Sequence, residues 1–270
     1  MIKSHHLLKA DTRRLYAWVL LALFLPALSL SAFDLYWTEQ KRILASDIDG
    51  SNQTVIFDGE TSSPTMTSFA VDIAVTDSHI YWSGHDGGDI WRANRDGSGA
   101  TQLIPNAGTS IHFLEINEAK NRLYYTDFNH AIVSATLEGT NIEQRGWQAL
   151  PYTGLAMAKS DATADELLVL TATDNQLRRF LPEQWDSRNE AELPESSIQT
   201  YGLAFDPDTQ DVFYTNFGNN TLNVYNLETK EHRTLLTPGM TQPLGVKLSP
   251  SRTHLLIAER GRGISAYQLD

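Results

Sequence analysis

The residues whose types could do chemistry lie in short loops rich in glycine. His85, Asp86 and Asp89 fall within the loop GHDGGD, and imidazole and carboxylate groups are ligands of divalent cations. Residues 47–52, DIDGSN, are similar to the start of a calcium loop, but the glutamate that such a loop needs does not follow. Because acidic glycine-rich loops are commonly plain turns, we expect no cofactor and no metal, with calcium or another divalent cation at residues 85–89 as the alternative.

Other side-chain types exclude several kinds of chemistry. The chain contains no cysteine, so disulfides, thiolate metal sites and a lipid-anchored cysteine are excluded. No Ser-His-Asp arrangement or phosphate-binding loop is evident, and no motif indicates a quinone or sugar dehydrogenase. The sequence therefore contains no catalytic motif.

The first 32 residues differ in composition from the rest of the chain. A head with four basic residues and one acidic residue precedes a nearly unbroken apolar run over residues 15–30. This layout predicts a secretory signal peptide at 1–32, cleaved after Ser31 or Ala32. An uncleaved anchor is the alternative, and a pair of arginines in the head also hints at a twin-arginine signal. We expect a periplasmic or secreted bacterial protein, with 33–270 as its one folded domain and no membrane insertion after cleavage.

The expected mature chain is strongly acidic. Without residues 1–32 it holds 17 Lys and Arg against 32 Asp and Glu, a net charge of −15. Such a surface argues against nucleic acid or an anionic membrane as the partner. A protein or peptide is the partner that remains, and the sequence indicates no oligomeric state.

One short strand pattern recurs along the chain. The runs LYWTE, IYWSG, LYYTD, LLVLT, VFYTN and LLIAE are spaced by 45, 43, 44, 45 and 43 residues, measured at one equivalent position. That position is occupied by Trp37, Trp82, Tyr125, Val169, Tyr214 and Ile257. Six copies at a constant period predict a repeat architecture.

Each repeat predicts four short antiparallel strands. In the fifth unit, the runs GLAFDP, DVFYTN, TLNVYNL and HRTLL are rich in β-branched and aromatic residues and are separated by turn residues. An Asp-Gly or Glu-Gly pair precedes the fourth strand in three units, at 49–50, 96–97 and 138–139, and such pairs favour hairpin turns. Four strands in about 44 residues are typical of a β-propeller blade. We therefore predict an all-β fold, a six-bladed β-propeller of four-stranded antiparallel blades.

The first three units resemble a known repeat family. The segments LYWTEQKRILASDIDGS, IYWSGHDGGDIWRANRDGSG and LYYTDFNHAIVSATLEGT are similar to the YWTD, or LDL-receptor class B, repeat. The fifth unit is closer to the related NHL repeat, and the whole resembles bacterial TolB-like propellers. The resemblance implies a six-bladed propeller that serves mostly in extracellular protein binding. The family's aspartate is present only as Asp127.

The strand count predicts incomplete terminal blades. From Phe33 the first unit begins at its second strand and the last ends at its third, which gives 22 strands in place of 24. Residues 25–30 occupy the register of the missing first strand, but they also belong to the apolar core of the leader. Both cannot hold in one molecule, and we expect cleavage and a three-stranded first blade.

Propeller ligands usually meet the face formed by second-to-third-strand loops and blade connections. On this loop face the sequence places residues of mixed polar and aromatic type: His85, Asp86, Asp89, His112, Phe128, Asn129, His130, Trp147, Phe217, Asn219, Arg260 and Arg262. Tyr201 lies near a blade connection as well. The arginines at 178–179 and the acidic stretch 183–195 predict a long solvated loop in the fourth unit.

A second set of charges is predicted to line the central channel. Aligned inner strands place Asp72, Glu115 and Lys247 at one level, with Ala156 and Ala204 at the same level in other units. Units three and six are opposite in a six-fold ring, so Glu115 and Lys247 are expected to face each other. A structural ion-pair network is the first interpretation, and a binding site is the second.

Two functions follow from these patterns. The first is a non-catalytic exported propeller that binds a protein or peptide through its loop face. The alternative is a gluconolactonase-like hydrolase in which a divalent cation in the channel polarises a lactone or ester. That alternative needs several oxygen ligands on the axis, for which Asp72, Glu115, Asn117 and Asp206 are candidates, and Lys247 would repel the cation.

Overall fold

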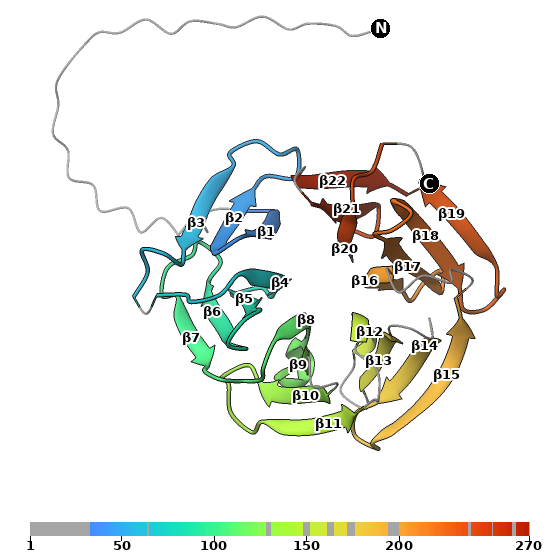
Figure 1. The fold of residues 1–270 in the computed structure, drawn as a ribbon, viewed down its shortest axis with the longest axis horizontal. Coiled ribbons are helices and arrows are strands. Elements are labelled where there is room, and N and C mark those ends of the chain that lie inside the picture. The colour runs from blue at the N-terminus through green and yellow to red at the C-terminus, as the bar shows by residue number, and fades with distance from the viewer. Residues whose placement is uncertain are drawn as a thin grey trace, which may run out of the picture. The chain divides into compact units, whose positions relative to one another are not determined.

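The strand-forming runs of the repeats build six antiparallel sheets around a common axis (Figure 1). The computed structural model describes residues 33–63, 65–127, 131–147, 152–160, 165–171, 176–193, 200–236, 239–249, 251–260 and 263–269. Each sheet is one blade, and in each blade the chain runs from the axis outward. The predicted six-bladed β-propeller is confirmed.

The described part of the chain contains 22 strands, numbered in chain order. Grouped by blade, they are β1 (Leu35–Glu39), β2 (Arg42–Ser46) and β3 (Thr54–Asp58); β4 (Ala70–Val75), β5 (His79–Gly84), β6 (Ile90–Asn94) and β7 (Thr101–Ile104); β8 (Ile111–Asn117), β9 (Arg122–Asp127), β10 (Ala131–Thr136) and β11 (Glu143–Trp147); β12 (Tyr152–Ser160), β13 (Asp165–Thr171), β14 (Gln176–Leu181) and β15 (Asp186–Glu192); β16 (Thr200–Asp206), β17 (Asp211–Asn216), β18 (Thr221–Asn226) and β19 (His232–Leu236); β20 (Pro243–Leu248), β21 (His254–Glu259) and β22 (Gly263–Gln268).

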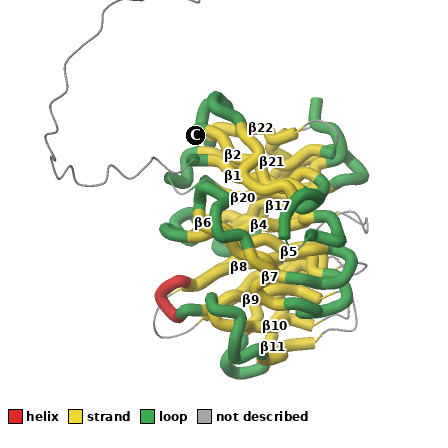
Figure 2. The backbone as a smooth tube through the Cα atoms, turned by 90° about the vertical axis from the view of Figure 1, so that its left-hand side faces the viewer, coloured by secondary structure: helices red, strands yellow, loops and turns green. Residues whose placement is uncertain are grey.

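The first and last blades are three-stranded within the described ranges, as predicted. Blade 1 has the order β1-β2-β3 and blade 6 the order β20-β21-β22, whereas the four blades between them have four strands each. One short 3₁₀ helix, η1 (Glu118–Lys120), joins β8 to β9 (Figure 2). No helix in these ranges has the length and apolar character needed to span a membrane.

The predicted Asp-Gly hairpins are present and also set the spacing between blades. Gly97 adopts φ +83°, a conformation that side chains rarely allow. A Cβ at this position would lie 1.9 Å from the carbonyl oxygen of Ile56 in the preceding blade. Glycine is therefore required here both by the turn and by the close approach of blade 1.

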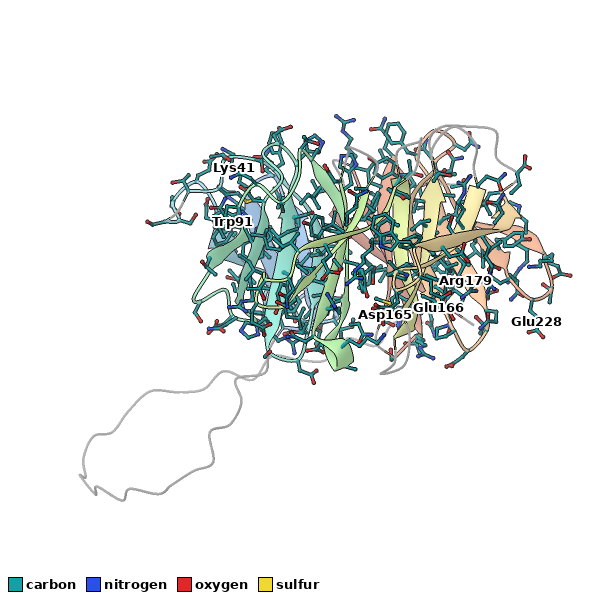
Figure 3. All side chains as sticks on the ribbon, turned by 90° about the horizontal axis from the view of Figure 1, so that it is seen from below. Lys41, Trp91, Asp165, Glu166, Arg179 and Glu228 are labelled. Carbon is teal, nitrogen blue, oxygen red and sulfur yellow. The ribbon has the colours of Figure 1, made fainter. Side chains whose placement is uncertain are left out.

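Five hydrophobic clusters join consecutive blades. In the cluster between blades 1 and 2, Trp82 and Trp91 stack at 6.0 Å beside Phe57, and both indoles are buried (Figure 3 labels Trp91). Equivalent clusters lie between blades 2 and 3, 3 and 4, 4 and 5, and 5 and 6. The repeated aromatic position is thus explained by packing between blades.

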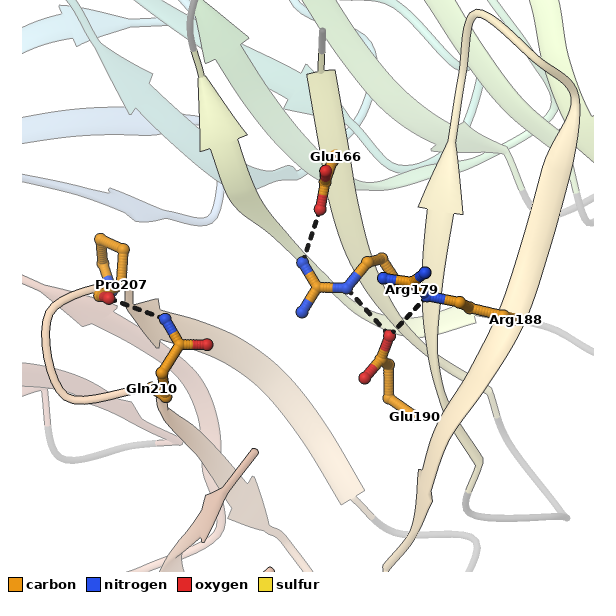
Figure 4. A network of polar contacts seen from close by, with 6 residues as sticks. All are labelled: Glu166, Arg179, Arg188, Glu190, Pro207 and Gln210. Atoms are coloured by element: carbon orange, nitrogen blue, oxygen red, sulfur yellow. Dashed lines mark hydrogen bonds and ion pairs between the residues drawn. The ribbon is translucent and has the colours of Figure 1, made fainter. Parts of the chain in front are cut away.

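The acidic stretch of the fourth repeat is not the predicted loop. Residues 186–192 form the outer strand β15, paired along its length with β14. The Arg179 guanidinium lies between Glu166 and Glu190 at 2.7 and 2.9 Å, and Arg188 bonds the same oxygen of Glu190 (Figure 4). The alternating charges therefore pair across neighbouring strands, which a composition-based prediction of a solvated loop overlooks.

Candidate functional site: the channel mouth

Every described inner strand is irregular close to the loop face. Each inner strand makes one pair with its second strand, or two pairs in blade 5, and then the register shifts by a β-bulge. The shifts fall at Ala70/Ile73, Ile111/Leu114, Tyr152/Gly154, Tyr201/Leu203 and Pro243/Gly245. Five bulges at one level re-aim side chains and free backbone groups around the mouth of the channel.

The Ser or Thr at the third position of the repeat motif forms hydrogen bonds with backbone groups near the bulges. Thr38 donates to the Val71 carbonyl at 3.0 Å, which ties blade 1 to blade 2. Ser83 accepts the Asp72 N–H at 3.1 Å, and Thr215 donates to the Tyr201 carbonyl. The third residue of the YWTD-like pattern therefore has a structural role in these blades.

Five residues around this mouth are linked by hydrogen bonds, by ring stacking or by a shared hydrogen-bond partner. We call them the mouth cluster: Phe69, His85, His112, Tyr201 and Leu244. The His85 N–H donates to the Phe69 carbonyl at 2.9 Å, and the His85 and His112 rings stack at 5.2 Å. The Tyr201 hydroxyl and His112 Nδ1 are 3.1 Å apart, and Thr215 Oγ1 lies within bonding distance of both the Tyr201 and Leu244 carbonyls. Blades 2, 3, 5 and 6 all contribute to it.

The mouth cluster combines exposed apolar surface with imidazole groups. Phe69 is 54% exposed and Leu244 is 36% exposed. Burial lowers the pKa of His112, and the neighbouring His85 lowers it further, while Asp127 opposes both effects. Burial also raises the pKa of Tyr201. Both shifts favour the neutral forms of His112 and Tyr201.

A charged cluster, the channel triad, lies deeper in the channel. Lys247 Nζ is 2.7 Å from Glu115 Oε1 and 3.5 Å from Asp72 Oδ2, and the same Asp72 oxygen accepts the Leu114 N–H at 2.9 Å. Glu115 and Lys247 therefore face each other from blades 3 and 6, as the register argument predicted. They lie three residues beyond His112 and Leu244, about 10 Å along the strands.

The charge balance of the triad favours a structural role. Burial opposes the charged form of Lys247, but the carboxylates of Asp72 and Glu115 outweigh it and raise the Lys247 pKa. Burial raises the pKa of Glu115 and the neighbouring Asp72 raises it further, while the Lys247 ammonium group opposes both effects only in part. The position in which a divalent cation would bind between these carboxylates is taken by the Lys247 ammonium group.

The other candidate cation ligands do not converge on the axis. The Asn117 amide is fully buried and donates to Asp165 at 2.5 Å. Asp206 is also buried and faces Arg252 at 3.8 Å. No group of three His, Asp or Glu side chains in the described ranges could hold a metal ion. The geometry gives the hydrolase alternative no support.

Asp72 belongs to the channel triad, but it does not occupy the inner-strand position that the sequence predicted for it. Ala156, Ala204, Glu115 and Lys247 each pair with the residue before the repeated aromatic position, as expected. In blade 2 the equivalent residue is Ala74, because the hairpin after β4 is two residues shorter. Asp72 lies in the bulge, and its carboxylate therefore lies beside β8.

Asp89 was wrongly placed among the exposed loop residues. It is buried, and its Oδ1 accepts the Asn106 N–H at 3.1 Å, so it holds the connection between blades 2 and 3. Among the side chains of His85, Asp86 and Asp89, the contact found is between His85 and Asp86, at 2.8 Å. The three side chains therefore do not form one cation site.

The motif aspartate also stabilises a blade connection. Asp127 Oδ1 accepts the N–H and the hydroxyl of Thr109, both at 2.9 Å. Glu259, its equivalent in blade 6, accepts the Thr241 N–H at 2.6 Å. These carboxylates accept hydrogen bonds from N–H groups of the preceding blade connection, so their role is structural.

The remaining predicted loop residues are separate from the mouth cluster. Asn219 and Arg260 are exposed in turns, and Phe217 is half-buried. Phe128, Asn129, His130 and Arg262 lie outside the described residues, as does the side chain of Trp147. None of these predicted roles in binding is tested by the geometry.

Sequence reasoning missed Phe69 and Leu244. Leu244 directly follows the first paired residue of its inner strand, as His112 and Tyr201 do in their own strands. This shared position was the available signal for Leu244. Phe69 precedes its strand, and nothing in the repeat pattern indicates its exposure.

Together these features define a six-bladed β-propeller with a YWTD-like fold and an aromatic channel mouth. A chain in the crystal structure of a nidogen/laminin complex matches it with a TM-score of 0.72 and 15% identity, over 87% of this chain and 88% of that chain. In all, 1541 solved chains match the fold, so the likeness identifies the fold alone. No family model matches the sequence, and no curated protein matches it significantly.

Proposed function

We propose that this chain is a non-catalytic propeller that binds a protein or peptide through the mouth cluster. The supporting observation is exposed apolar surface at the channel mouth, flanked by hydrogen-bonding His85, His112 and Tyr201. Aromatic and aliphatic anchors beside a few polar groups are typical of protein interfaces. The structural neighbour was solved in a complex whose title names two proteins, nidogen and laminin, which also favours a protein partner.

Affinity capture with matched variants tests the proposal. Wild type, Phe69→Ala and Trp185→Ala are immobilised, and envelope proteins bound to each are quantified. Phe69 and Trp185 are similarly exposed, at 54% and 57%, but Trp185 lies in the β14–β15 hairpin at the other end of its blade. A partner of the mouth is expected to lose about tenfold or more in affinity for Phe69→Ala and to keep its affinity for Trp185→Ala. Equal binding by all three proteins would contradict the proposal.

Metal dependence distinguishes the proposal from the hydrolase alternative. Because the Lys247 ammonium group lies between Asp72 and Glu115, we expect no stoichiometric divalent cation in the purified protein. The melting temperature is then expected to be the same with and without EDTA. A bound divalent cation and a large fall of Tm in EDTA would favour the hydrolase.

We further propose that the protein acts in the periplasm or outside a bacterial cell. The support is the basic, apolar and small-residue order of the first 32 residues. Cell fractionation with intact-mass analysis of the N-terminus tests this proposal. A cytoplasmic protein that begins at Met1 would contradict it.

A further inference from the structure

Blade 6 differs from the other blades at its outer edge. β22 is its outermost strand, and in the described ranges no further strand pairs with it (Figure 1). In blades 1 to 5 the equivalent strand is paired with one more strand, which is β3, β7, β11, β15 or β19. An unpaired strand edge is a place where an extended segment of another protein can add.

The backbone of β22 directs alternate polar groups to this edge. The Leu269 N–H donates to the Thr253 carbonyl at 2.8 Å, which makes these residues a hydrogen-bonded pair in the register of β21 and β22. Because hydrogen-bonded and non-hydrogen-bonded pairs alternate along an antiparallel ladder, Ile264 and Ala266 lie in non-hydrogen-bonded pairs. Their N–H and C=O groups therefore point away from β21, toward the outer edge.

One apolar side chain of β22 is exposed where its equivalents are buried. In every blade an aliphatic residue pairs with the third position of the YWTD-like motif from the strand that follows the motif. In blade 6 this residue is Ile264, which is 38% exposed. In blades 1 to 5 the equivalents are all 0% exposed: Ile43, Ile90, Ile132, Leu177 and Leu222.

The outer strands of other blades show which side chains cover this position. The residue directly opposite it is Phe57 in blade 1, Ile104 in blade 2 and Ala191 in blade 4. Each packs in the same hydrophobic cluster as the aliphatic residue that it faces. Directly opposed residues share one face of a sheet, so a strand added to β22 places one side chain against Ile264. An apolar residue is expected there.

Charge restricts the added segment further. β22, GISAYQ, contains no charged residue and no proline, which are the residue types that commonly protect an edge strand. Among the described outer strands of the other blades, only β7 is likewise free of charge. Residues 33–270 carry a net charge of −15. A segment without net negative charge is therefore favoured, and a second acidic copy of the chain is disfavoured.

We propose that the outer edge of β22 binds an extended segment of another protein, which adds to blade 6 as its fourth strand. The segment places an apolar side chain against Ile264 and carries no net negative charge. This surface lies on the outer strand of blade 6, and the proposal is independent of binding at the mouth cluster.

A peptide with these properties provides the first test. The probe is fluorescein-labelled KEHRTLL, the sequence of residues 230–236, which ends in an apolar pair and has two basic residues against one acidic residue. Its fluorescence anisotropy is titrated with full-chain wild type, Ala266→Pro and the matched control Ala266→Ser. Proline removes the outward N–H of residue 266 and is tolerated in an edge strand, whereas serine keeps this donor.

We expect Ala266→Pro to weaken peptide binding by about tenfold or more and Ala266→Ser to leave it within about twofold of wild type. The melting temperature of each variant verifies that it is folded. No binding to wild type, or equal binding by wild type and Ala266→Pro, would overturn the proposal. Binding that Phe69→Ala abolishes and Ala266→Pro preserves would also overturn it, because the peptide would then occupy the mouth cluster.

Backbone hydrogen exchange of the wild type, measured by NMR with and without the peptide, needs no variant. The amides of Ser265 and Tyr267 lie in hydrogen-bonded pairs with β21 and should exchange slowly in both samples. The amides of Ile264 and Ala266 should exchange fast in the free protein and about tenfold or more slowly with saturating peptide. Slow exchange of these two amides in the free protein would overturn the proposal, because the edge would already be covered.

Discussion

Trp82 and Trp37 occupy the same position of the repeat but meet different surroundings. Trp82 lies between blades 1 and 2, stacked on Trp91 with Phe57 at 4.9 Å, and no part of it is exposed. Trp37 belongs to blade 1, which shares no hydrophobic cluster with blade 6 among the described residues, and it is half-buried. Residue type and strand position are equal, so the surroundings make the difference: Ile73 of the inner strand of blade 2 packs in the cluster of Trp82, whereas blade 1 has no inner strand among the described residues. Burial in a propeller is a property of the interface between repeats.

The difference also shows how blade 6 is held. On one side the cluster around Val246 and Ile257 joins it to blade 5. Toward blade 1 the described residues contain no such cluster, but Lys247 reaches across the channel to Glu115 and Asp72 in blades 3 and 2. Ion pairs across the channel thus link blade 6 to blades 2 and 3, which are not its neighbours in the ring.

The largest expected effect contrasts the two tryptophans. Trp82→Ala removes a fully buried indole and is expected to lower the free energy of unfolding by about 3–5 kcal/mol. Trp37→Ala removes a half-buried indole and is expected to cost about 1–2 kcal/mol in a chain without residues 1–32. Urea unfolding monitored by circular dichroism gives both values. Equal losses would show that the interface between blades 6 and 1 is packed like the other interfaces.

Substitution of Asp165 tests the polar contacts at the interface between blades 3 and 4. Its carboxylate is buried and accepts hydrogen bonds from Asn117 and Tyr124 of blade 3, with Lys120 at 3.6 Å (Figure 3 labels Asp165). Burial and the bond to Asp165 also raise the pKa of Tyr124. Asp165→Asn is expected to cost about 2–3 kcal/mol, because a buried acceptor is lost.

The control for this measurement is Glu228→Gln, a substitution at an exposed turn residue. Thermal and urea unfolding should leave that variant indistinguishable from wild type. If Asp165→Asn lowered the free energy of unfolding no more than Glu228→Gln does, the polar contacts between blades 3 and 4 would add no stability beyond that of packing.

Lys247→Met tests whether the channel triad stabilises the ring. The substitution leaves two carboxylates without their cation, and a cost of about 1–2 kcal/mol is expected at pH 7, since the lysine side chain is 39% exposed. Burial already raises the pKa of Glu115 in the wild type, and the substitution removes the ammonium group that opposes this effect. The variant's deficit should therefore shrink as the pH falls and Glu115 becomes protonated.

Unfolding of Lys247→Met and of the exposed control Lys230→Met at pH 7 and pH 4 measures this dependence. A deficit that is the same at both pH values would show that the lysine acts through packing of its aliphatic stem alone.

Much of the fold could be predicted from the sequence because one structural unit is repeated six times along the chain. The repeat period located the second strand of each blade, and the glycine turns located the hairpins. The sequence therefore predicted 22 strands and two incomplete blades, as the structure has them. The alternating charges of β15 were misassigned, since the partner strand that pairs with them lies outside any local window.

The site was predicted less completely, for a geometric reason. Register alone brought Glu115 opposite Lys247, because both lie on regular parts of the ladder. The positions of Asp72 and Leu244 depend on bulges and on hairpin length, which shift a strand by one or two residues. Such shifts change which face a side chain occupies, and residue types alone do not reveal them.

The smallest expected effect concerns the mouth, where His112 links blade 3 to Tyr201 of blade 5. Burial and His85 lower the His112 pKa below its usual 6.5, so folding favours the neutral ring. The stability that this group contributes is complete above pH 6.5 and is lost as the pH falls through the lowered pKa. Wild type should therefore lose more Tm between pH 8 and pH 5.5 than His112→Gln, which does not titrate. Parallel Tm curves would show that His112 charges as readily in the folded ring as in the unfolded chain, and that the mouth is open to water.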